Sequence, residues 1–488
     1  MSSLKKLLGQ TAVYGLSSIV GRLLNYLMVP LYTYNLPAAE YGMVIELYSY
    51  VALLFALLTY GMETTFFRFS ETENDKKQVL STSSIALLVS TFVFLIVSWF
   101  SRESIAGALG YEAHVEFVSW FIIIIAFDAL TSIPFAWLRQ QNKAFNFAGL
   151  KLINIFVNLS LNLFFILYCP RVMAQGESHW LYGFVNSIFN PEMLVSYVFI
   201  SNLIASGITM AMMLPIYKHI KLGFNWDIWK RMMPYTLPVL VVNITGLIPI
   251  SMDKILLPVF YSGTAEESMH QLGVYGANTK IAVIMLLFIQ TFRYAADPFF
   301  FAESRNHNAR ETYAKVMHWF VIFGSGIFLA TVMFLDVIKY FVGTEYRDGL
   351  FVVPILLMGN LILGVNYNLS FWYKLTNKTI YGAWFSIIGA VTSIGLNIIL
   401  VPRFGMMGSA WSVFAAYLLP TVLTYFYGKK YYPIPYKVWP MLLYPTMVYI
   451  IYYVQSAMEW SLIFRAVFFV VLGVSIVLYE RRRKTVKA

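Results

Sequence analysis

The sequence predicts an all-α protein that crosses a membrane many times, built from two six-helix repeats and two further helices. Of its 488 residues, 59% are hydrophobic and only 12% are charged, with a mean hydropathy of +0.67. A soluble protein carries about 25% charged residues, so this composition indicates an integral membrane protein. Apolar runs recur along the whole length and leave no room for a separate soluble domain. The single cysteine, Cys169, excludes an intrachain disulfide.

We expect about fourteen membrane-spanning helices. About 20 predominantly apolar residues suffice to cross the hydrocarbon core of a bilayer as a helix. An even number of spans places both ends of the chain on the same side of the membrane. The expected spans are 11–35, 41–66, 79–100, 116–138, 147–168, 193–217, 234–260, 273–299, 314–337, 350–372, 380–401, 408–428, 438–455 and 461–479.

The distribution of cations predicts the orientation. With the N-terminus in the cytoplasm, 24 of the 35 Lys and Arg residues fall on the cytoplasmic side, when Lys315 at the cytoplasmic end of its span is counted, and five fall in outside loops. Because cytoplasmic loops are rich in Lys and Arg, we expect both termini to be cytoplasmic. This topology accounts for the net charge of +11 without a nucleic-acid partner. Lys5 and Lys6 precede a full-length span with no cleavage site, so we do not expect a cleavable signal.

The first expected span carries one charge, Arg22, near its middle. Gly15, Ser18, Arg22 and Asn25 fall on one stripe of this helix. An Arg at the centre of a bilayer costs at least ~2.5 kcal/mol, so we expect Arg22 and Asn25 to face a polar cavity. The alternative is an intramembrane ion pair with a purely structural role.

The chain contains an internal repeat. An offset of 234 aligns Tyr41-Gly42 with Tyr275-Gly276, and an offset of 235 aligns WLRQQNK (137–143) with WYKLTNK (372–378). Because six is an even number, two such repeats insert with the same topology and are related by an axis along the membrane normal.

The repeat predicts three parts of the chain. We expect a six-helix N-terminal half over 1–230, a six-helix C-terminal half over 231–430, and two additional helices with a basic cytoplasmic tail over 431–488. The halves differ in the aromatic outer loop 169–192, whose counterpart in the second half is short. We interpret this loop as an interfacial segment; a lid or a sugar contact is the alternative.

Three features resemble a known family. They are Arg22 and Pro30 followed by the turn at 40–42, the echo MDKILLP…GVYG (252–276), and VPRFGMMGSA (401–410). Over essentially the whole chain they resemble the polysaccharide-transporter branch of the multidrug/oligosaccharidyl-lipid/polysaccharide exporter superfamily, the O-antigen and capsule flippases. One departure is Ile250, which stands where Arg22 would align at the offset of 228 that relates the first span to the seventh.

The resemblance implies a V-shaped, two-lobed transporter in the bacterial inner membrane. It would flip undecaprenyl-diphosphate-linked oligosaccharides outward by alternating access. The resemblance further implies a cationic central cavity for the diphosphate and a groove for the lipid tail beside the last two helices. Its partners would be the lipid-linked oligosaccharide, the bilayer, and polysaccharide polymerases and glycosyltransferases.

A diphosphate inside a membrane requires fixed cations, and Arg and Lys both bind phosphate. The candidate substrate-binding cations are Arg22, Lys254, Lys280 and Lys151. Lys254 follows Asp253, but helical neighbours point about 100° apart and need not neutralise each other; packing against an acid of another helix is the alternative. Lys280 lies near the outer end of its span and faces either the cavity or the interface.

Other polar residues within the spans have two interpretations. Lys151 begins a stripe with Asn154, Asn158 and Asn162, which would either bond to a neighbouring helix or line the cavity. The pattern predicts an i,i+4 ion pair between Arg293 and Asp297, and a snorkelling side chain for Arg465 at the outer interface. Acids that could carry a coupling ion are Glu63, Asp128, Asp253 and Asp297, of which we expect Asp128 to be the most isolated.

The sequence argues against an enzyme. It contains no phosphate-binding Gly-x4-Gly-Lys-Ser/Thr loop and no His-Glu-x-x-His pair, and we expect no cofactor and no metal site. A membrane glycosyltransferase or polymerase should have a large catalytic outer loop and no six-helix duplication. The remaining alternatives are a multidrug-type, cation-coupled exporter of small molecules and a flippase for the lipid-linked peptidoglycan precursor.

Overall fold

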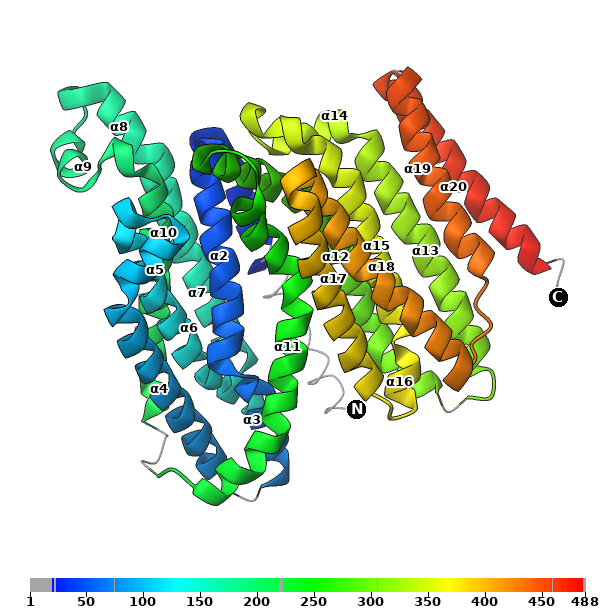
Figure 1. Cartoon of the computed structure of the whole chain (residues 1–488), viewed down its shortest axis with the longest axis horizontal. Helices are drawn as coiled ribbons and strands as arrows, with labels where there is room; N and C mark the ends of the chain where they lie inside the picture. Colours follow the sequence, from blue (N-terminus) through cyan, green and yellow to red (C-terminus); the bar gives the residue numbers. More distant parts are fainter. Residues whose placement is uncertain are drawn as a thin grey trace. The chain divides into compact units, whose positions relative to one another are not determined.

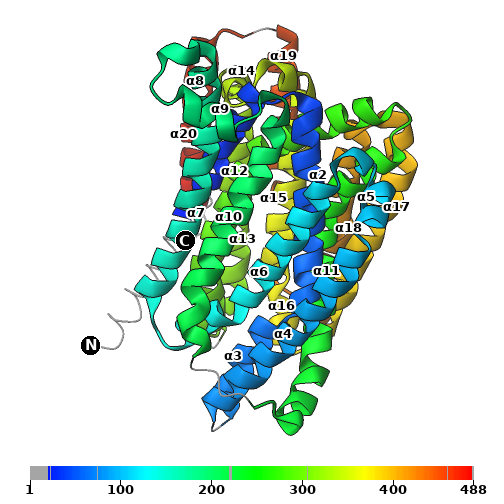
Figure 2. The ribbon, with the colours of Figure 1, turned by 90° about the vertical axis from the view of Figure 1, so that its left-hand side faces the viewer.

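A computed structural model describes residues 20–21, 23–73, 75–218, 223–304, 306–458 and 460–485. None of these residues lies in a β-strand, and nearly all are helical (Figures 1 and 2). Twelve helices within the described ranges are long and apolar enough to cross a membrane, and they coincide with the second to twelfth and the fourteenth expected spans. The expected multi-spanning all-α fold is therefore confirmed.

Contacts between residues divide the chain into two compact units, Met1–Ser251 and Met252–Ala488, which we call the N-terminal and C-terminal units. The main helices of the N-terminal unit are α2 (Ala38–Thr59), α3 (Met62–Thr72), α4 (Lys76–Phe100), α5 (Arg102–Leu109), α6 (Val115–Gln140), α7 (Ala144–Asn162), α8 (Cys169–Gln175), α9 (Tyr182–Ile188), α10 (Leu194–Tyr217) and the first part of α11 (Trp226–Phe260).

The C-terminal unit begins within α11. Its further helices are α12 (Ala265–Glu303), α13 (Ala309–Met333), α14 (Leu335–Ile338), α15 (Val353–Leu369), α16 (Phe371–Leu375), α17 (Ile380–Phe404), α18 (Met406–Tyr431), α19 (Val438–Met458) and α20 (Leu462–Thr485). Helix α19, 21 residues long, occupies the thirteenth expected span.

The same helix pairs pack together inside each unit. In the N-terminal unit, α6 packs on α2, α4 and α10, and α10 packs on α7. In the C-terminal unit, α15 packs on α12, α13 and α18, and α18 packs on α17. Each pair in one unit has its counterpart in the other. The offset of 234 or 235 relates α2, α4, α6 and α7 to α12, α13, α15 and α17, and α10 corresponds to α18 because the loop before α18 is shorter. The packing thus supports a duplication of one helical arrangement.

The aligned WLRQQNK and WYKLTNK segments have the same local structure. Asn142, after α6, and Asn377, after α16, both have positive φ, 57° and 56°. A left-handed residue just past a helix ends it, and Asn adopts this conformation more easily than most residues. Trp137 and Trp372 are both buried. The repeated motif therefore sets where two equivalent helices end.

The outer loop 169–192 is folded rather than extended. It forms α8 and α9, which pack around an apolar cluster of Cys169, Val172, Val185 and Phe189. Trp180 lies outside this cluster and is 84% exposed. Since the loop has its own apolar core, its exposed aromatic side chains are not needed for its folding. The interfacial role of the loop stays a prediction.

The first part of α11 packs against the break between α2 and α3. Tyr60 and Gly61 have φ of 37° and 75°, which ends α2 and redirects the chain into α3. Beside it, the buried hydroxyls of Thr65 and Thr236 lie 2.9 Å apart. A Cβ atom at Gly61 would lie 2.7 Å from Cγ1 of Val239. Glycine is therefore required here both for its positive φ and for the close approach of α11.

Replacing Gly61 with alanine is expected to destabilise the protein by about 1–3 kcal/mol, because alanine is strained at positive φ and its methyl group meets Val239. Thermal unfolding in detergent measures the loss. Gly149→Ala in α7 is the matched control, since a Cβ there meets nothing within 4 Å. Equal melting temperatures for the two variants would contradict the close packing at Gly61.

Candidate functional site

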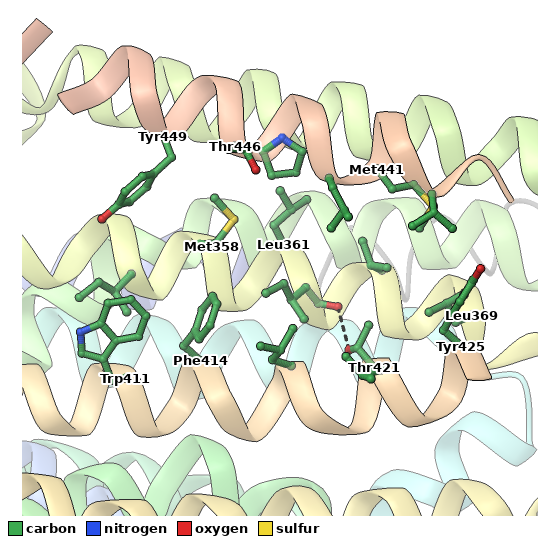
Figure 3. Close-up of a pocket in the computed structure, with 18 of the residues that line it drawn as sticks. Met358, Leu361, Leu369, Trp411, Phe414, Thr421, Tyr425, Met441, Thr446 and Tyr449 are labelled. Carbon is green, nitrogen blue, oxygen red and sulfur yellow. Dashed lines mark hydrogen bonds between the residues drawn. The ribbon is translucent and has the colours of Figure 1, made fainter. Parts of the chain in front are cut away.

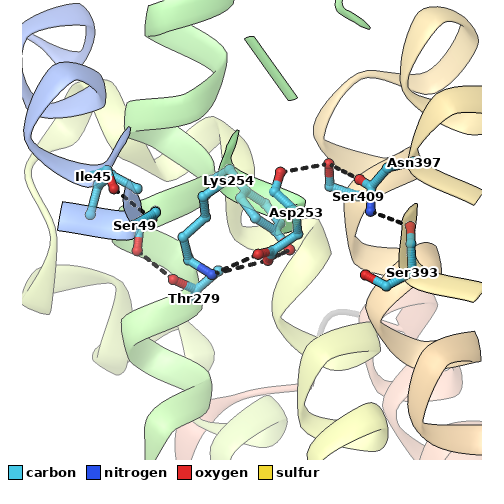
Figure 4. A network of polar contacts seen from close by, with 10 residues as sticks. Ile45, Ser49, Asp253, Lys254, Thr279, Ser393, Asn397 and Ser409 are labelled. Atoms are coloured by element: carbon cyan, nitrogen blue, oxygen red, sulfur yellow. Dashed lines mark hydrogen bonds and ion pairs between the residues drawn. The ribbon is translucent and has the colours of Figure 1, made fainter. Parts of the chain in front are cut away.

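A buried ion pair lies near the C-terminal end of α11 (Figure 4). The side chain of Asp253 is 2% exposed, and the Lys254 ammonium lies 3.0 Å from each of its carboxylate oxygens. The Tyr275 hydroxyl of α12 donates a hydrogen bond to Oδ2 of Asp253 at 2.8 Å. Adjacent positions on a helix point apart, but the four-carbon stem of lysine is long enough to bend back to its neighbour. Among the described residues, the acid that neutralises Lys254 is thus the residue before it.

The same segment is fastened to two other helices. The Ser409 hydroxyl of α18 lies 3.3 Å from the backbone oxygen of Asp253 and 3.1 Å from Oδ1 of Asn397 in α17 (Figure 4). The Asn397 amide donates to the backbone oxygen of Ser393. All three side chains are fully buried. The sequence analysis did not identify Ser409. Asn397 aligns with Asn162 at the same offset of 235 that relates the segments 137–143 and 372–378.

Lys280 of α12 is a cation of the C-terminal unit that no described acid neutralises. Its side chain is half-buried and has no hydrogen bond or ion pair with the described residues. The ammonium of Lys254 is close enough for the two positive charges to repel. Since Asp253 already compensates Lys254, an anion arriving here would meet the uncompensated charge of Lys280.

Two of the expected cavity residues lie on the first helix. Arg22 lies outside the described residues. Asn25 lies on the described part of that helix and is exposed. The cavity-facing stripe of Arg22 and Asn25 therefore stays a prediction.

The polar stripe of α7 bonds to neighbouring helices. The Asn154 amide donates to the Thr209 hydroxyl of α10 at 2.9 Å. The buried Asn162 amide donates to Oδ1 of Asn158 at 2.8 Å, and its own Oδ1 accepts a hydrogen bond from the Tyr32 hydroxyl at 3.0 Å. These contacts favour the helix-to-helix interpretation of the asparagines.

Lys151 and Glu63 each contact another part of the N-terminal unit. Lys151 is exposed, and its ammonium lies 4.1 Å from the centre of the Phe135 ring, a cation–π contact. Glu63 forms an ion pair with Arg139 of the repeated motif at 2.9 Å. This pairing makes Glu63 a weaker candidate for a coupling ion than an acid without a cation beside it.

Asp128 of α6 is the acid that best fits an ion-coupling role. Its carboxylate accepts a hydrogen bond from the Ser206 hydroxyl of α10 at 2.9 Å and has no ion pair within the part of the chain that the structure describes. Asn202, one turn before Ser206, donates to the hydroxyl of Tyr48 at 2.6 Å. Hydroxyl and amide groups thus lie around a half-buried carboxylate that forms no ion pair with the described residues, although the charge of Lys151 is near enough to act on it.

One expectation about an arginine is wrong. The Arg293 guanidinium lies 4.1 Å from the centre of the Tyr367 ring and does not pair with Asp297 in the described structure. A side chain of a neighbouring helix thus takes the place of the expected partner on the same helix. Arg465 of α20 is 12% exposed and forms an ion pair with Asp336 of α14, whose side chain is 61% exposed. Its snorkelling toward the outer interface stays a prediction.

A second polar contact fastens α20. His318 of α13 lies 3.0 Å from the buried Glu480 carboxylate, which also accepts a hydrogen bond from Tyr444 of α19 at 2.7 Å. Together with the Arg465 ion pair, this contact fixes α20 to the C-terminal unit near both of its ends.

An apolar groove of about 650 Å³ runs between α15, α18 and α19 (Figure 3). Its walls include Met358 and Leu361 from α15, Trp411 and Phe414 from α18, and Leu442 and Tyr449 from α19. No charged side chain lines it. The resemblance implied a lipid-tail groove beside the last two helices, and of these α19 forms one wall.

No protein-family model matches the sequence, and no curated protein matches it. Solved structures match the fold. The lipid II flippase MurJ in an inward closed conformation aligns with a TM-score of 0.67 and 13% identity, covering 96% of this chain and 99% of that one. An inward-facing multidrug resistance MATE transporter of the MOP superfamily aligns with a TM-score of 0.65 and 15% identity, covering 84% and 94%.

A Vibrio cholerae MATE transporter, VcmN carrying a D35N mutation, aligns with a TM-score of 0.54 and 14% identity, over 88% of this chain and 97% of that one. At these identities the similarity concerns the fold. The chain therefore has the helical fold shared by the lipid II flippase MurJ and the MATE transporters of the MOP superfamily.

Proposed function

We propose that this protein is a flippase for lipid-linked oligosaccharides. It moves undecaprenyl-diphosphate-linked sugar units from the cytoplasmic to the outer leaflet of the bacterial inner membrane by alternating access, for the assembly of O-antigen, capsule or exopolysaccharide. The observation that carries the proposal is the apolar groove between α15, α18 and α19. A lipid substrate needs an apolar surface for its chain while its headgroup crosses the membrane.

The length of the groove supports a lipid occupant. Its α19 wall extends from Val438 to Tyr449. At a rise of ~1.5 Å per residue this stretch is about 17 Å long, roughly half of the ~30 Å hydrocarbon core. The groove therefore matches the depth of about one leaflet, as expected for a surface that holds part of a chain extending from one side of the bilayer.

The headgroup requires cations, and Lys280 is our first candidate. A diphosphate would compensate its charge, and Lys254 would contribute a second contact while it stays close to Asp253. We retain Arg22 as a third contact from the sequence pattern. Asp128 would take up the coupling proton or cation. By the same proposal, glycosyltransferases supply the substrate and a polymerase consumes it.

The two alternatives are a multidrug-type exporter and a flippase for the lipid-linked peptidoglycan precursor. A multidrug-type exporter is less well supported, because the MATE match covers 84% of this chain against 96% for MurJ. The MurJ match favours a second cargo, the lipid-linked peptidoglycan precursor. Both cargoes share a polyprenyl diphosphate and differ in their sugars, so they would use the same groove.

Proteoliposomes with a fluorescent undecaprenyl-diphosphate oligosaccharide test the proposal. Addition of a membrane-impermeant quencher reports how much of the lipid has changed leaflet. We expect protein-dependent translocation of this lipid and slower translocation of the peptidoglycan precursor. Export of organic cations without lipid translocation would support the multidrug-type alternative instead.

Filling the groove is expected to slow flipping. Thr446 lines the groove from α19, and Thr446→Trp would place an indole where the lipid chain lies. We expect the flipping rate in the proteoliposome assay to fall about tenfold, which corresponds to roughly 1.4 kcal/mol of lost binding. Met447→Trp is the matched control, one residue further along and outside the groove lining. Equal rates for the two variants would argue against the groove as the chain site.

A further inference from the structure

The apolar groove continues into a second, polar pocket. This pocket has a volume of about 340 Å³ and lies where α18 ends and the chain passes to α19. Leu369 and Tyr425 line both cavities, so the two are contiguous. By the predicted topology, this end of the groove faces the cytoplasm.

The pocket offers hydrogen-bond donors that the protein itself does not use. Lys429 lines it, is exposed, and has no hydrogen bond or ion pair with any described residue. Tyr425 and Tyr436 also line it, and neither hydroxyl has a hydrogen bond to another group in the described ranges. Burial raises the pKa of the Tyr436 phenol, which therefore remains a donor at neutral pH.

The charge around the pocket has one sign. None of its lining residues carries a carboxylate. Besides Lys429, the Arg310 guanidinium of α13 lies 4.7 Å from the centre of the Tyr432 ring, which is itself part of the lining. An anion entering here would find a cation and phenolic donors and would meet no acidic side chain on the pocket walls.

The pocket is held in shape by its surroundings. Pro433 and Pro435 restrict the backbone of the linker, and Tyr432 and Ile434 pack against the buried cluster that contains Phe300. Trp372 also lines the pocket, and its indole donates a hydrogen bond to the backbone oxygen of Thr424 at 3.0 Å. A pocket formed in advance loses less conformational entropy when a ligand binds.

We propose that this polar pocket captures the diphosphate of the lipid-linked substrate at the cytoplasmic surface, while the start of its polyprenyl chain lies in the adjoining groove. The inference rests on the proposed function and adds a loading site to it. The occupant is a polyprenyl diphosphate because a polar anion site opens directly into an apolar groove about one leaflet deep. Lys429, Tyr425 and Tyr436 are the groups that recognise the phosphates.

Binding of undecaprenyl diphosphate, titrated by native mass spectrometry in detergent, tests the site. We expect Lys429→Ala to weaken binding about tenfold, as for loss of one charge-assisted hydrogen bond, and Tyr436→Phe to weaken it several-fold. Lys430→Ala is the matched control, since Lys430 lies outside the pocket lining. Undecaprenol, which has the chain without the phosphates, should bind all variants equally.

The possible outcomes separate the site from the function. One outcome would overturn the loading site and leave the flippase. In it, the wild-type protein flips the substrate, but its affinity for undecaprenyl diphosphate equals the affinities of Lys429→Ala and Tyr436→Phe. Lys429-dependent binding without flipping would overturn the flippase and support the site. Displacement of undecaprenyl diphosphate by an equal concentration of phosphatidylglycerol would assign the pocket to bulk phospholipid and overturn the proposed occupant.

Discussion

Replacing Lys254 with methionine is expected to lower the free energy of unfolding by about 3–5 kcal/mol, because it leaves a buried carboxylate without its cation. Asp253 is 2% exposed, and among the described residues the Tyr275 hydroxyl would remain as the hydrogen-bond partner of its side chain. Chemical denaturation in detergent micelles measures the change. Lys230→Met, at an exposed position of the same helix, is the matched control and should change stability by less than about 0.5 kcal/mol.

The double variant Asp253→Asn/Lys254→Met is expected to recover most of the lost stability. Both charges are then absent, and the amide can still accept the hydrogen bond from Tyr275. If Lys254→Met alone were as stable as the wild type, the ion pair would not be structural. Lys254 would then be free to contact a substrate, as the sequence pattern allowed.

Replacing Lys280 with methionine is expected to reduce flipping at least about tenfold without destabilising the protein. Lys280 has no ion pair with the described residues, so its removal leaves no acid uncompensated. Removing a half-buried charge that repels Lys254 should leave the melting temperature unchanged or raise it. Initial flipping rates in proteoliposomes and thermal unfolding in detergent, measured on the same preparation, provide the two readouts.

Lys280→Arg should keep most of the activity, because arginine preserves the charge and contacts phosphate well. A structural role for Lys280 predicts the opposite pattern, in which Lys280→Met lowers stability and activity together. Normal flipping by Lys280→Met would exclude this residue as a required phosphate contact. The contrast with Lys254 is informative because both lysines lie in the C-terminal unit and only one has a carboxylate partner.

The sequence predicts the fold well because the signals for membrane helices are local. Apolar length alone locates the spans, and the described helices long enough to cross the membrane fall at expected positions. The repeat is also visible in the sequence, since left-handed residues such as Asn142 and Asn377 end equivalent helices at aligned positions. Helix existence depends on neighbours within one or two turns, which a sequence contains directly.

The site depended on tertiary structure for a physical reason. A polar group within the membrane takes the best partner within reach, and helical periodicity does not tell which helix faces it. Sequence reasoning therefore paired Arg293 with Asp297, where the fold brings Tyr367 against Arg293 instead. Lys280 is unneutralised only because no acid of a neighbouring described helix reaches it.

The groove and its polar pocket are likewise tertiary features. They form where α15 lies beside the consecutive helices α18 and α19, from which α16 and α17 separate it along the chain, and the three leave space between them. Lys429 appears in the sequence as one of two adjacent basic residues at a helix end. Composition and periodicity thus determined that this chain is a duplicated helical membrane protein. Only the packing of its helices decided which cations are neutralised and which are available to a ligand, because that depends on distances between residues remote in sequence.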